Sequence, residues 1–404
     1  MTIKIIYFLL PFFCFIVPIS TFGSTVCLLA IILLWLVTPD YQKKMRVFWQ
    51  EPITRVFLIG ILLSLGSLFY TEANTKEALD GLKDSLRLGS IGIFIYYFKF
   101  YASETLKKRC IQAFIFAMLI TAVLGYLKYF FHLLPHKQGL TEAAVFKNHI
   151  KTSFFMTMAV YFMGHYLRAQ PKNILLWIGI FFMSGYVLFL SEGRMGYIIF
   201  GVLALYYFWD MAKIRGMIGI ASVLISVIVL SQCFSLKLYE RMAYLPKDLT
   251  MFLVNQQVAT SSLGSRLSFI DVSTRLIQEK SWFGWGVGGF RQAYKSRVPQ
   301  ENLQTDNPHN EFLRIGVEFG ALGLAWFMYL IFTVHKKINQ LPKGQQFLMR
   351  GIGLAFLIGC LANSWLMDFS EGMFIVVMLS LFLGKIHADN AINHCDHVQL
   401  ASST

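Results

Sequence analysis

Long apolar runs, separated by short polar connections, recur along nearly the whole chain. Most of these runs hold about 17 to 25 residues, the length that an α-helix needs to cross the hydrocarbon core of a bilayer. We therefore predict an all-α integral membrane protein with about twelve transmembrane helices. The predicted spans are Ile3–Ile19, Thr21–Val37, Val56–Tyr70, Leu82–Phe98, Ile111–Leu127, Thr152–Leu167, Ile174–Leu190, Met195–Trp209, Met217–Cys233, Glu311–Val334, Gly351–Met367 and Phe369–Gly384.

One stretch is too polar to span a bilayer and too long for a simple connection. It covers residues 236–308 and is predicted to be a large loop containing short helices on the side of the membrane opposite the cytoplasm. Within it, Ser265–Glu279 has apolar residues among charged ones in a pattern typical of a helix on a membrane surface. The loop separates transmembrane helices one to nine in residues 1–235 from helices ten to twelve in residues 309–387, and a cytoplasmic tail follows at 388–404.

The composition also indicates a lipid environment. The chain is 56% hydrophobic and 16% aromatic, with a mean hydropathy of +0.56, which is more apolar than a soluble surface can be. The net charge of +14 comes from basic residues dispersed between apolar runs, so it does not indicate a nucleic-acid partner. With both termini cytoplasmic, the short inner connections hold sixteen Lys and Arg residues and the short outer ones eight, as the positive-inside rule predicts. Membrane lipids are therefore expected partners.

Unusual residues gather just before the tenth predicted span. Asn307 is a good helix N-cap and Pro308 a good first helical residue, so His309 is predicted to lie in the first helical turn. Offsets of 7, 11 and 14 residues from His309 return to nearly the same helix face, and each offset holds a glycine, namely Gly316, Gly320 and Gly323. The glycines would let another helix approach closely. His309 is then either an interfacial packing residue or a general base that the positive end of the helix keeps neutral.

Two arginines on the predicted outer face are candidates for binding an anion. Arg194 lies in a very short connection between spans, and Arg266 begins the predicted surface helix. Arginine makes forked contacts with phosphate oxygens, which suits a lipid diphosphate at this depth. The alternatives are an ion pair, for example between Arg194 and Glu192, or simple snorkelling to the membrane surface.

Three further polar residues are supporting candidates. Asn310 follows the histidine, while His149 and Lys151 lie on the outer side and are candidates for lining the same cavity. A hydrated connection is the simpler interpretation of His149 and Lys151. No metal or cofactor is predicted, because the outer carboxylates show no spacing typical of metal ligands. These carboxylates are Asp271, Glu279, Glu301 and Asp306.

A glycine-aromatic segment runs from Trp282 to Phe290 within the large loop. Its residues Gly284, Gly286 and Gly289 formally satisfy the dinucleotide-binding pattern G-x-G-x-x-G. No βαβ unit surrounds them, however, so a nucleotide site is not the preferred interpretation. We expect a tight turn that presents aromatic side chains to the membrane surface.

The residues around His309 resemble the signature of the O-antigen ligase and polymerase superfamily. In this sequence the signature consists of His309-Asn310, nine further residues and Gly320-Ala321-Leu322-Gly323. The resemblance extends over most of the chain through the predicted spans, the single large loop, the Gly-Arg step at Arg194 and the loop helix at Arg266. Only the histidine motif is specific. The family often has a proline before the glycine-aromatic turn, whereas this chain has Lys280-Ser281-Trp282.

The resemblance implies a metal-independent, inverting glycosyltransferase at the periplasmic face of a Gram-negative inner membrane. Members of the ligase branch, the WaaL type, move O-antigen polysaccharide from undecaprenyl diphosphate to lipid A-core oligosaccharide. By position, His309 matches the proposed base, and Arg194 and Arg266 match arginines that bind the diphosphate.

Several alternatives share these features. An O-antigen polymerase and a protein O-oligosaccharyltransferase use the same donor chemistry, and the motif does not separate them. We expect the ligase because the chain length and single large loop suit it and no extra soluble domain is expected. A lipid-sugar flippase or transporter would have similar spans, with Glu318 as its main intramembrane charge.

Overall fold

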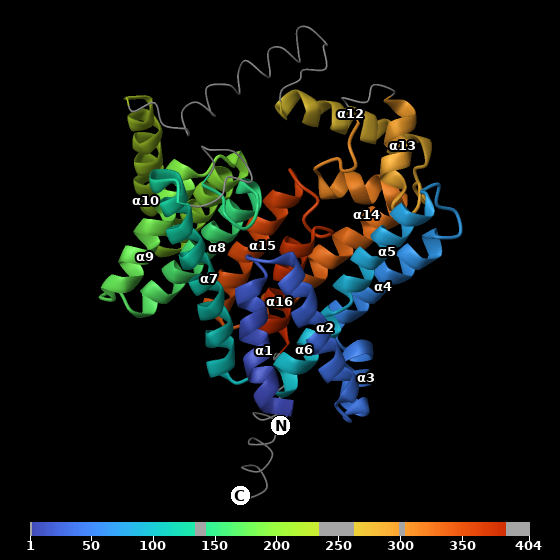
Figure 1. The fold of residues 1–404 in the computed structure, drawn as a ribbon, viewed down its shortest axis with the longest axis horizontal. Helices are drawn as coiled ribbons and strands as arrows, with labels where there is room; N and C mark the ends of the chain where they lie inside the picture. The colour runs from blue at the N-terminus through green and yellow to red at the C-terminus, as the bar shows by residue number, and fades with distance from the viewer. Residues whose placement is uncertain (1, 134–142, 234–261, 299–303, 385–404) are drawn as a thin grey trace, which may run out of the picture.

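The computed structural model describes residues 2–133, 143–233, 262–298 and 304–384. Within these ranges the chain forms helices and no strands. Figure 1 shows them as a bundle, with α12 (Ser262–Glu279) lying across one end. Parts of the predicted periplasmic loop and the whole predicted tail at 388–404 fall outside the described ranges.

Fourteen further α-helices and one π-helix make up the rest of the helices in the described chain. In order they are α1 (Thr2–Ile16), α2 (Thr21–Val37), α3 (Tyr41–Gln50), α4 (Pro52–Ser67), α5 (Thr75–Leu88), α6 (Ile91–Phe100), α7 (Glu104–Phe131), α8 (His149–Ala169), α9 (Ile174–Gly185), the π-helix η1 (Tyr186–Leu190), α10 (Arg194–Cys233), α13 (Gly289–Arg297), α14 (Glu311–Ile338), α15 (Lys343–Cys360) and α16 (Phe369–Leu383).

Three of these helices are long and apolar enough to cross a membrane alone. They are α7, the Met195–Gly216 part of α10, and α14. The pair α2 and α3 meets the same criterion together, although its two members bend by 117°. Shorter apolar helices occur at Lys4–Ile16, Pro52–Ser67, Ile174–Leu190 and Phe369–Leu383. The protein is thus an all-α membrane protein, while the predicted number of about twelve spans stays a prediction.

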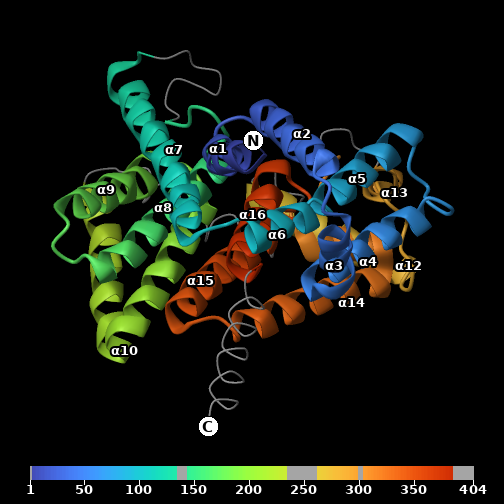
Figure 2. The same cartoon turned by 90° about the horizontal axis from the view of Figure 1, so that it is seen from below.

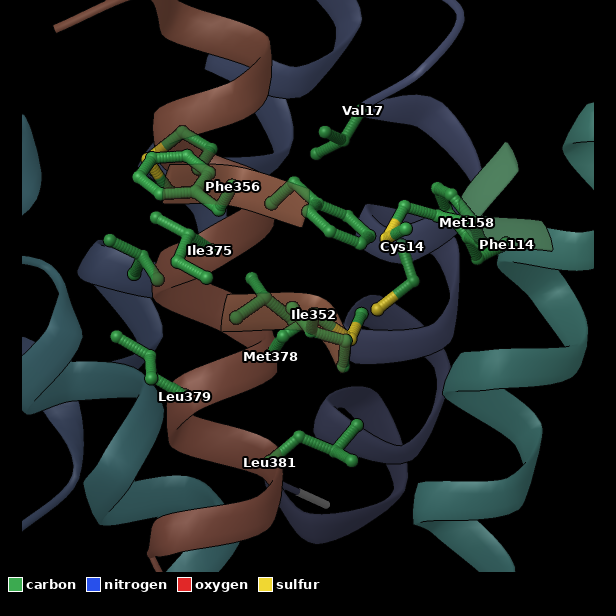
Figure 3. Packing of buried hydrophobic residues seen from close by; sticks show 14 of the residues in the cluster. Cys14, Val17, Phe114, Met158, Ile352, Phe356, Ile375, Met378, Leu379 and Leu381 are labelled. Atoms are coloured by element: carbon green, nitrogen blue, oxygen red, sulfur yellow. The ribbon is translucent and has the colours of Figure 1, made fainter. Parts of the chain in front are cut away.

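Helix α16 forms the centre of the bundle. Its residues from Ser370 to Leu383 are all buried, as expected of a helix that is apolar on every side. Figure 3 shows Cys14 of α1, Phe114 of α7, Met158 of α8 and Ile352 of α15 gathered around it. Because interiors pack densely, these neighbours fix the position of the residues at the start of α16.

Two of the predicted spans are wrong in detail. The predicted span Leu82–Phe98 is instead two helices, α5 and α6, which are separated at Gly89 and Ser90. Helix α5 is amphipathic and charged, so a search for apolar runs detects only its last residues. The predicted span Gly351–Met367 ends early, because α15 stops at Cys360 and residues 361–368 form a turn. Asparagine and serine within that turn compete with helical hydrogen bonds.

Helix α10 also departs from the prediction of two separate spans. It continues from Arg194 to Cys233 and has non-helical backbone angles only at Ala212 and Lys213. The predicted break between the eighth and ninth spans is therefore a kink rather than a loop. Lys213 has a φ of 53°, in the left-handed region that side chains other than glycine seldom adopt.

Helix α14 is broken at Gly320, where φ is 62° and ψ is −150°. The glycine-aromatic turn, residues 282–290, fills the break with its own backbone. The amides of Trp285 and Gly286 donate to the carbonyl oxygens of Val317 and Glu318 at 2.8 Å each. Backbone groups freed within a membrane helix must find partners inside the protein, and the turn provides them.

The same turn carries both exposed and buried aromatic rings. Trp282 and Phe283 are 71% and 60% exposed, while Trp285 is only 7% exposed and packs beneath α12. Tyr70, at the end of α4, donates its hydroxyl to the carbonyl of Phe283 at 2.9 Å. The predicted tight turn with outward aromatic side chains is therefore confirmed, and no βαβ unit occurs in the described part of the chain.

Candidate active site

His309 lies in the loop just before α14 and not within its first turn. The N-cap of α14 is Asn310, whose side chain accepts a hydrogen bond from the amide of Leu313 at 3.1 Å. The prediction that Asn307 caps the helix is therefore wrong. Asn307 instead accepts from the amide of His309 at 2.8 Å and from the Ser364 hydroxyl at 2.7 Å. Short polar side chains often bond to nearby backbone in this way, and here they shape the loop around the histidine.

The imidazole of His309 packs against the surface helix α12. Its ring centroid lies 5.9 Å from that of Phe269 in α12. Burial lowers the pKa of His309 below its ordinary value of 6.5, and the positive charge of Arg266 lowers it further, while Asp368 opposes both. The predicted direction is confirmed, but its main causes are burial and a neighbouring arginine rather than the helix terminus. The structure thus brings His309, Arg266 and Asp368 together.

Lys151 joins this group through Asp368. Its ammonium lies 3.3 Å from a carboxylate oxygen of Asp368 and 3.2 Å from one of Glu371. Asn148 caps α8 by accepting from the amide of Lys151 at 3.0 Å, which fixes the lysine in the first turn of α8. The predicted supporting role of Lys151 therefore has a geometric basis. Next to it, burial and the charge of Lys151 lower the pKa of Lys147 to about 8.

Arg194 is the first residue of α10, beside the first turn of α8. A β-carbon on the preceding residue, Gly193, would lie 2.9 Å from the Ser153 hydroxyl and 3.2 Å from the carbonyl oxygen of His149. Only a glycine lets the connection run this close to α8. The backbone of Arg194 is therefore adjacent to the helix end that carries Lys151. Its side chain is outside the described part of the structure, so its predicted anion contact stays a prediction.

The two other supporting candidates have different positions. Asn310 donates its side-chain amide to the carbonyl of Leu361 at 2.9 Å, in addition to capping α14. It therefore ties the histidine loop to the turn at residues 361–368. His149 is the half-buried first residue of α8.

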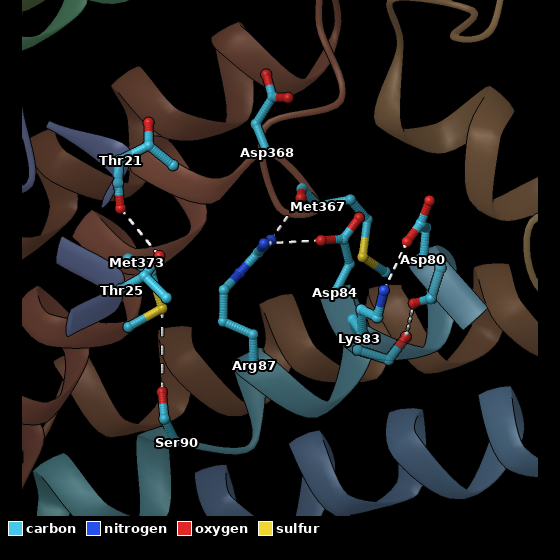
Figure 4. A network of polar contacts seen from close by, with 12 residues as sticks. Thr21, Thr25, Asp80, Lys83, Asp84, Arg87, Ser90, Met367, Asp368 and Met373 are labelled. Carbon is cyan, nitrogen blue, oxygen red and sulfur yellow. Dashed lines mark hydrogen bonds and ion pairs between the residues drawn. The ribbon is translucent and has the colours of Figure 1, made fainter. Parts of the chain in front are cut away.

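Sequence reasoning missed a set of charged side chains that surround the turn at residues 361–368. Glu311 is fully buried, and its carboxylate accepts from the amide of Leu366 at 2.7 Å. Arg87 lies 2.7 Å from Asp84 and donates to the carbonyl of Met367 at 2.5 Å. Figure 4 shows this arginine between Asp84 and Met367, with Asp368 on the adjoining turn. Buried charges of this kind need partners, and here the partners include the backbone of the turn.

Two signals could have identified these residues. Glu311 directly follows the histidine motif, and Asp368 is a charged residue between two apolar runs. Intramembrane or juxtamembrane charges of this type are uncommon and mark functional sites. Glu318, considered above for transport, instead pairs with Arg314 at 3.5 Å.

The comparison with known protein families bears on this arrangement. The family model described as O-antigen ligase matches residues 179–328. This part of the chain is therefore similar to the O-antigen ligase family. The match supports membership of the O-antigen ligase and polymerase superfamily, whose members are glycosyltransferase-like enzymes acting on polysaccharide and lipid-linked substrates. No curated protein matches the chain significantly.

The residues that match the family model contain part of the site described above. They extend from α9 to the second half of α14 and include Arg194, Arg266, His309 and Gly320. Lys151 and Asp368 lie outside the matched residues, on α8 and at the start of α16. The matched residues and the flanking helices therefore contribute to one grouping of charged side chains.

The predicted outer carboxylates are each held by an arginine where the structure describes them. Their ion pairs are Asp271 with Arg275, Glu279 with Arg297 and Asp306 with Arg291. Glu301 lies outside the described residues. Among the described residues, no group of three or more His, Cys, Asp or Glu side chains is arranged to hold a metal ion.

Proposed function

We propose that this protein is an O-antigen ligase of the WaaL type. It transfers O-antigen polysaccharide from undecaprenyl diphosphate to a sugar hydroxyl of lipid A-core oligosaccharide, with inversion at the anomeric carbon. The reaction takes place at the periplasmic face of a Gram-negative inner membrane. The observation that carries the proposal is the grouping of His309, Arg266 and Asp368 at the start of the broken helix that bears the family motif.

In this proposal, neutral His309 is the general base. It takes the proton from the acceptor hydroxyl while that oxygen attacks the anomeric carbon of the donor sugar. The bond from this carbon to the diphosphate oxygen breaks, and undecaprenyl diphosphate leaves with the electron pair. Asp368 then faces a newly formed imidazolium, which it stabilises because it already favours the charged form.

The departing diphosphate is stabilised by cations of the protein itself. Arg266 lies beside His309, and Arg194 begins the helix next to Lys151. Forked guanidinium contacts match phosphate oxygens, and such preorganised charges act where negative charge develops. The half-buried histidine loop limits access of water, which would compete with the acceptor hydroxyl. The proposal therefore assigns charge stabilisation to side chains and no step to a metal ion.

The test is reconstitution of the purified protein in liposomes with undecaprenyl-diphosphate-linked glycan and lipid A-core oligosaccharide. Ligation would appear as a ladder of glycan-bearing lipid A-core on a gel, and the His309→Ala protein is the matched control. Lengthening of the lipid-linked glycan without any product on lipid A-core would instead establish a polymerase. Movement of the donor across the bilayer without new glycosidic bonds would establish a transporter.

A further inference from the structure

An apolar groove extends away from the site just described. It runs between α14 and α15 and is backed by α4 and α16, with a volume of about 260 Å³. Its wall is formed mainly by apolar side chains, including Phe57, Phe327, Leu330, Phe356 and Leu379. We call this space the α14–α15 groove. The proposed transfer reaction makes no use of it.

The two ends of the α14–α15 groove differ. One end lies against Leu366, whose amide donates to Glu311 from the turn at residues 361–368. The other end is bordered by His335 and Arg350, both of which are exposed. Between the ends, a β-carbon added at Gly353 would meet no atom within 4 Å, so the groove is open along this part of α15.

A groove of this chemistry is not suited to water. Ordered water needs two or more polar partners, and the lining offers almost none away from the basic end. Left empty, the aromatic and aliphatic side chains of the wall would lose dispersion contacts. In a bilayer, the apolar groups available to fill the space are the hydrocarbon chains of lipids.

The charges at the open end indicate which lipid fits. The last turn of α14 carries the exposed residues His335 and Lys336, and α15 begins at the exposed Lys343. Basic residues at the membrane surface attract anionic headgroups. This end lies at the far end of α14 from His309, beyond the break at Gly320. A lipid whose headgroup binds here therefore belongs to the leaflet opposite the proposed active site.

We propose that the α14–α15 groove binds one acyl chain of an anionic phospholipid, with the phosphate at Arg350. Arg350 is oriented for this by α15 and its neighbours, since its Nη2 donates to Asn339 at 2.8 Å and to Gln346 at 3.2 Å. The donor of the transfer reaction is a different ligand, because its diphosphate is proposed to bind at the other end of α14. The inference does not depend on the proposed function.

The experiment measures lipid retention by native mass spectrometry. The full-length protein in detergent is titrated with phosphatidylglycerol and, separately, with phosphatidylcholine of the same chains. We expect Gly353→Leu to lower the affinity for phosphatidylglycerol by at least about tenfold, because the new side chain occupies the groove. The variant should fold, since space is available and leucine is a better helix former than glycine.

Two further variants make the result specific. Gly219→Leu is the matched control, because Gly219 is an exposed glycine of α10 whose added β-carbon would also meet nothing within 4 Å. It should retain lipid as the unmodified protein does. Arg350→Gln should reduce the preference for phosphatidylglycerol over phosphatidylcholine. The proposal is overturned if Gly353→Leu retains phosphatidylglycerol normally, if the unmodified protein binds both lipids equally, or if undecaprenyl phosphate displaces phosphatidylglycerol from the groove.

Discussion

His309 has a backbone conformation that is uncommon for a residue with a side chain. Its φ is 51°, in the left-handed region, and the neighbouring asparagines hold it there. Asn307 bonds to the histidine amide, while Asn310 starts the helix directly after it. Strained backbone of this kind persists only where the surroundings fix it, and it is concentrated at functional sites. The two asparagines thus position the imidazole.

Replacement of His309 by alanine tests the base without disturbing this loop. The amide of residue 309 would still donate to Asn307, so the variant should fold and insert into the membrane. We expect ligation to fall by at least about 100-fold, the lower range for removing a general base. The gel-ladder assay measures activity, and thermal unfolding in detergent measures stability. Near-normal ligation by a stable variant would show that His309 is a packing residue.

The pH dependence of ligation should respond in opposite directions to the two charges beside His309. A base must be neutral, so activity should fall as the pH drops through the pKa of His309, which lies below 6.5. Arg266 lowers this pKa, so Arg266→Gln should move the acidic limb of the rate profile to higher pH. Asp368 raises it, so Asp368→Asn should move the limb to lower pH. Rates at saturating donor from pH 4.5 to 8 measure the shifts, and two shifts in the same direction would contradict the assignment.

At the scale of elements, the pairing of a loop with a broken helix holds the site together. The glycine-aromatic turn donates amides to α14 before the break, and the amide of Ala321 donates back to Ser281 at 2.7 Å. Since α12 leads directly into this turn, the pairing fixes α12, and with it Arg266 and Phe269, relative to α14. The break in α14 therefore helps to fix the position of Arg266, in addition to allowing the glycine-aromatic turn to pack against α14.

Gly320→Ala should lower the stability of the protein more than it lowers the ligation rate of the molecules that fold. The φ and ψ of Gly320 lie in a region that is almost restricted to glycine, at a cost of about 1–3 kcal/mol for another residue. An added β-carbon would also lie 2.6 Å from the backbone of Trp282. We expect a lower midpoint of thermal unfolding and poor expression. Gly66→Ala in α4 is the control, because a β-carbon there would meet nothing within 4 Å. Equal stability of the two variants would contradict this account.

The sequence identified several residues of the candidate site, but it gave less information about which of them are neighbours in space. His309 and Arg266 could be predicted as neighbours because the motif and the surface helix lie on the same side of the predicted topology. The role of Asp368 could not be predicted, since its approach to His309 depends on a turn that an apolar-run analysis assigns to a span. The break at Gly320 was also missed, because three glycines at helical spacing are equally typical of an unbroken helix. The break at Gly320 is required only by the glycine-aromatic turn, which lies about thirty residues earlier in the sequence.

At the scale of the whole molecule, ion pairs between the segments predicted to join the spans occur at two opposite ends of the bundle. At one end, Lys99 and Lys337 both face Glu51, which joins three connections that are predicted to be cytoplasmic. At the other end, Lys151 meets Asp368 in connections that are predicted to be periplasmic. Figure 1 shows α3 near the end of the bundle opposite α12 and α13, so in Figure 2, which is seen from below, α3 lies on the near side of the molecule. This separation agrees with the excess of basic residues in the predicted inner connections.

The orientation of the protein in the membrane can be tested by cysteine labelling. Four native cysteines, Cys14, Cys27, Cys110 and Cys360, are buried and should not react. The remaining two, Cys233 and Cys395, are changed to serine to give the background for single exposed cysteines.

In this background, Lys76→Cys at the start of α5 should react with a membrane-impermeant maleimide in intact spheroplasts. Lys172→Cys, before α9, should react only after permeabilisation. Both positions are exposed, so accessibility to solvent is matched and only the side of the membrane differs. The positive-inside bias requires this outcome, because Lys172 belongs to the basic-rich set of connections and Lys76 to the poorer set. The reverse pattern would place His309 on the cytoplasmic side and would contradict ligation at the periplasmic face. Retained ligation in both cysteine variants is the control that the labelled molecules are folded.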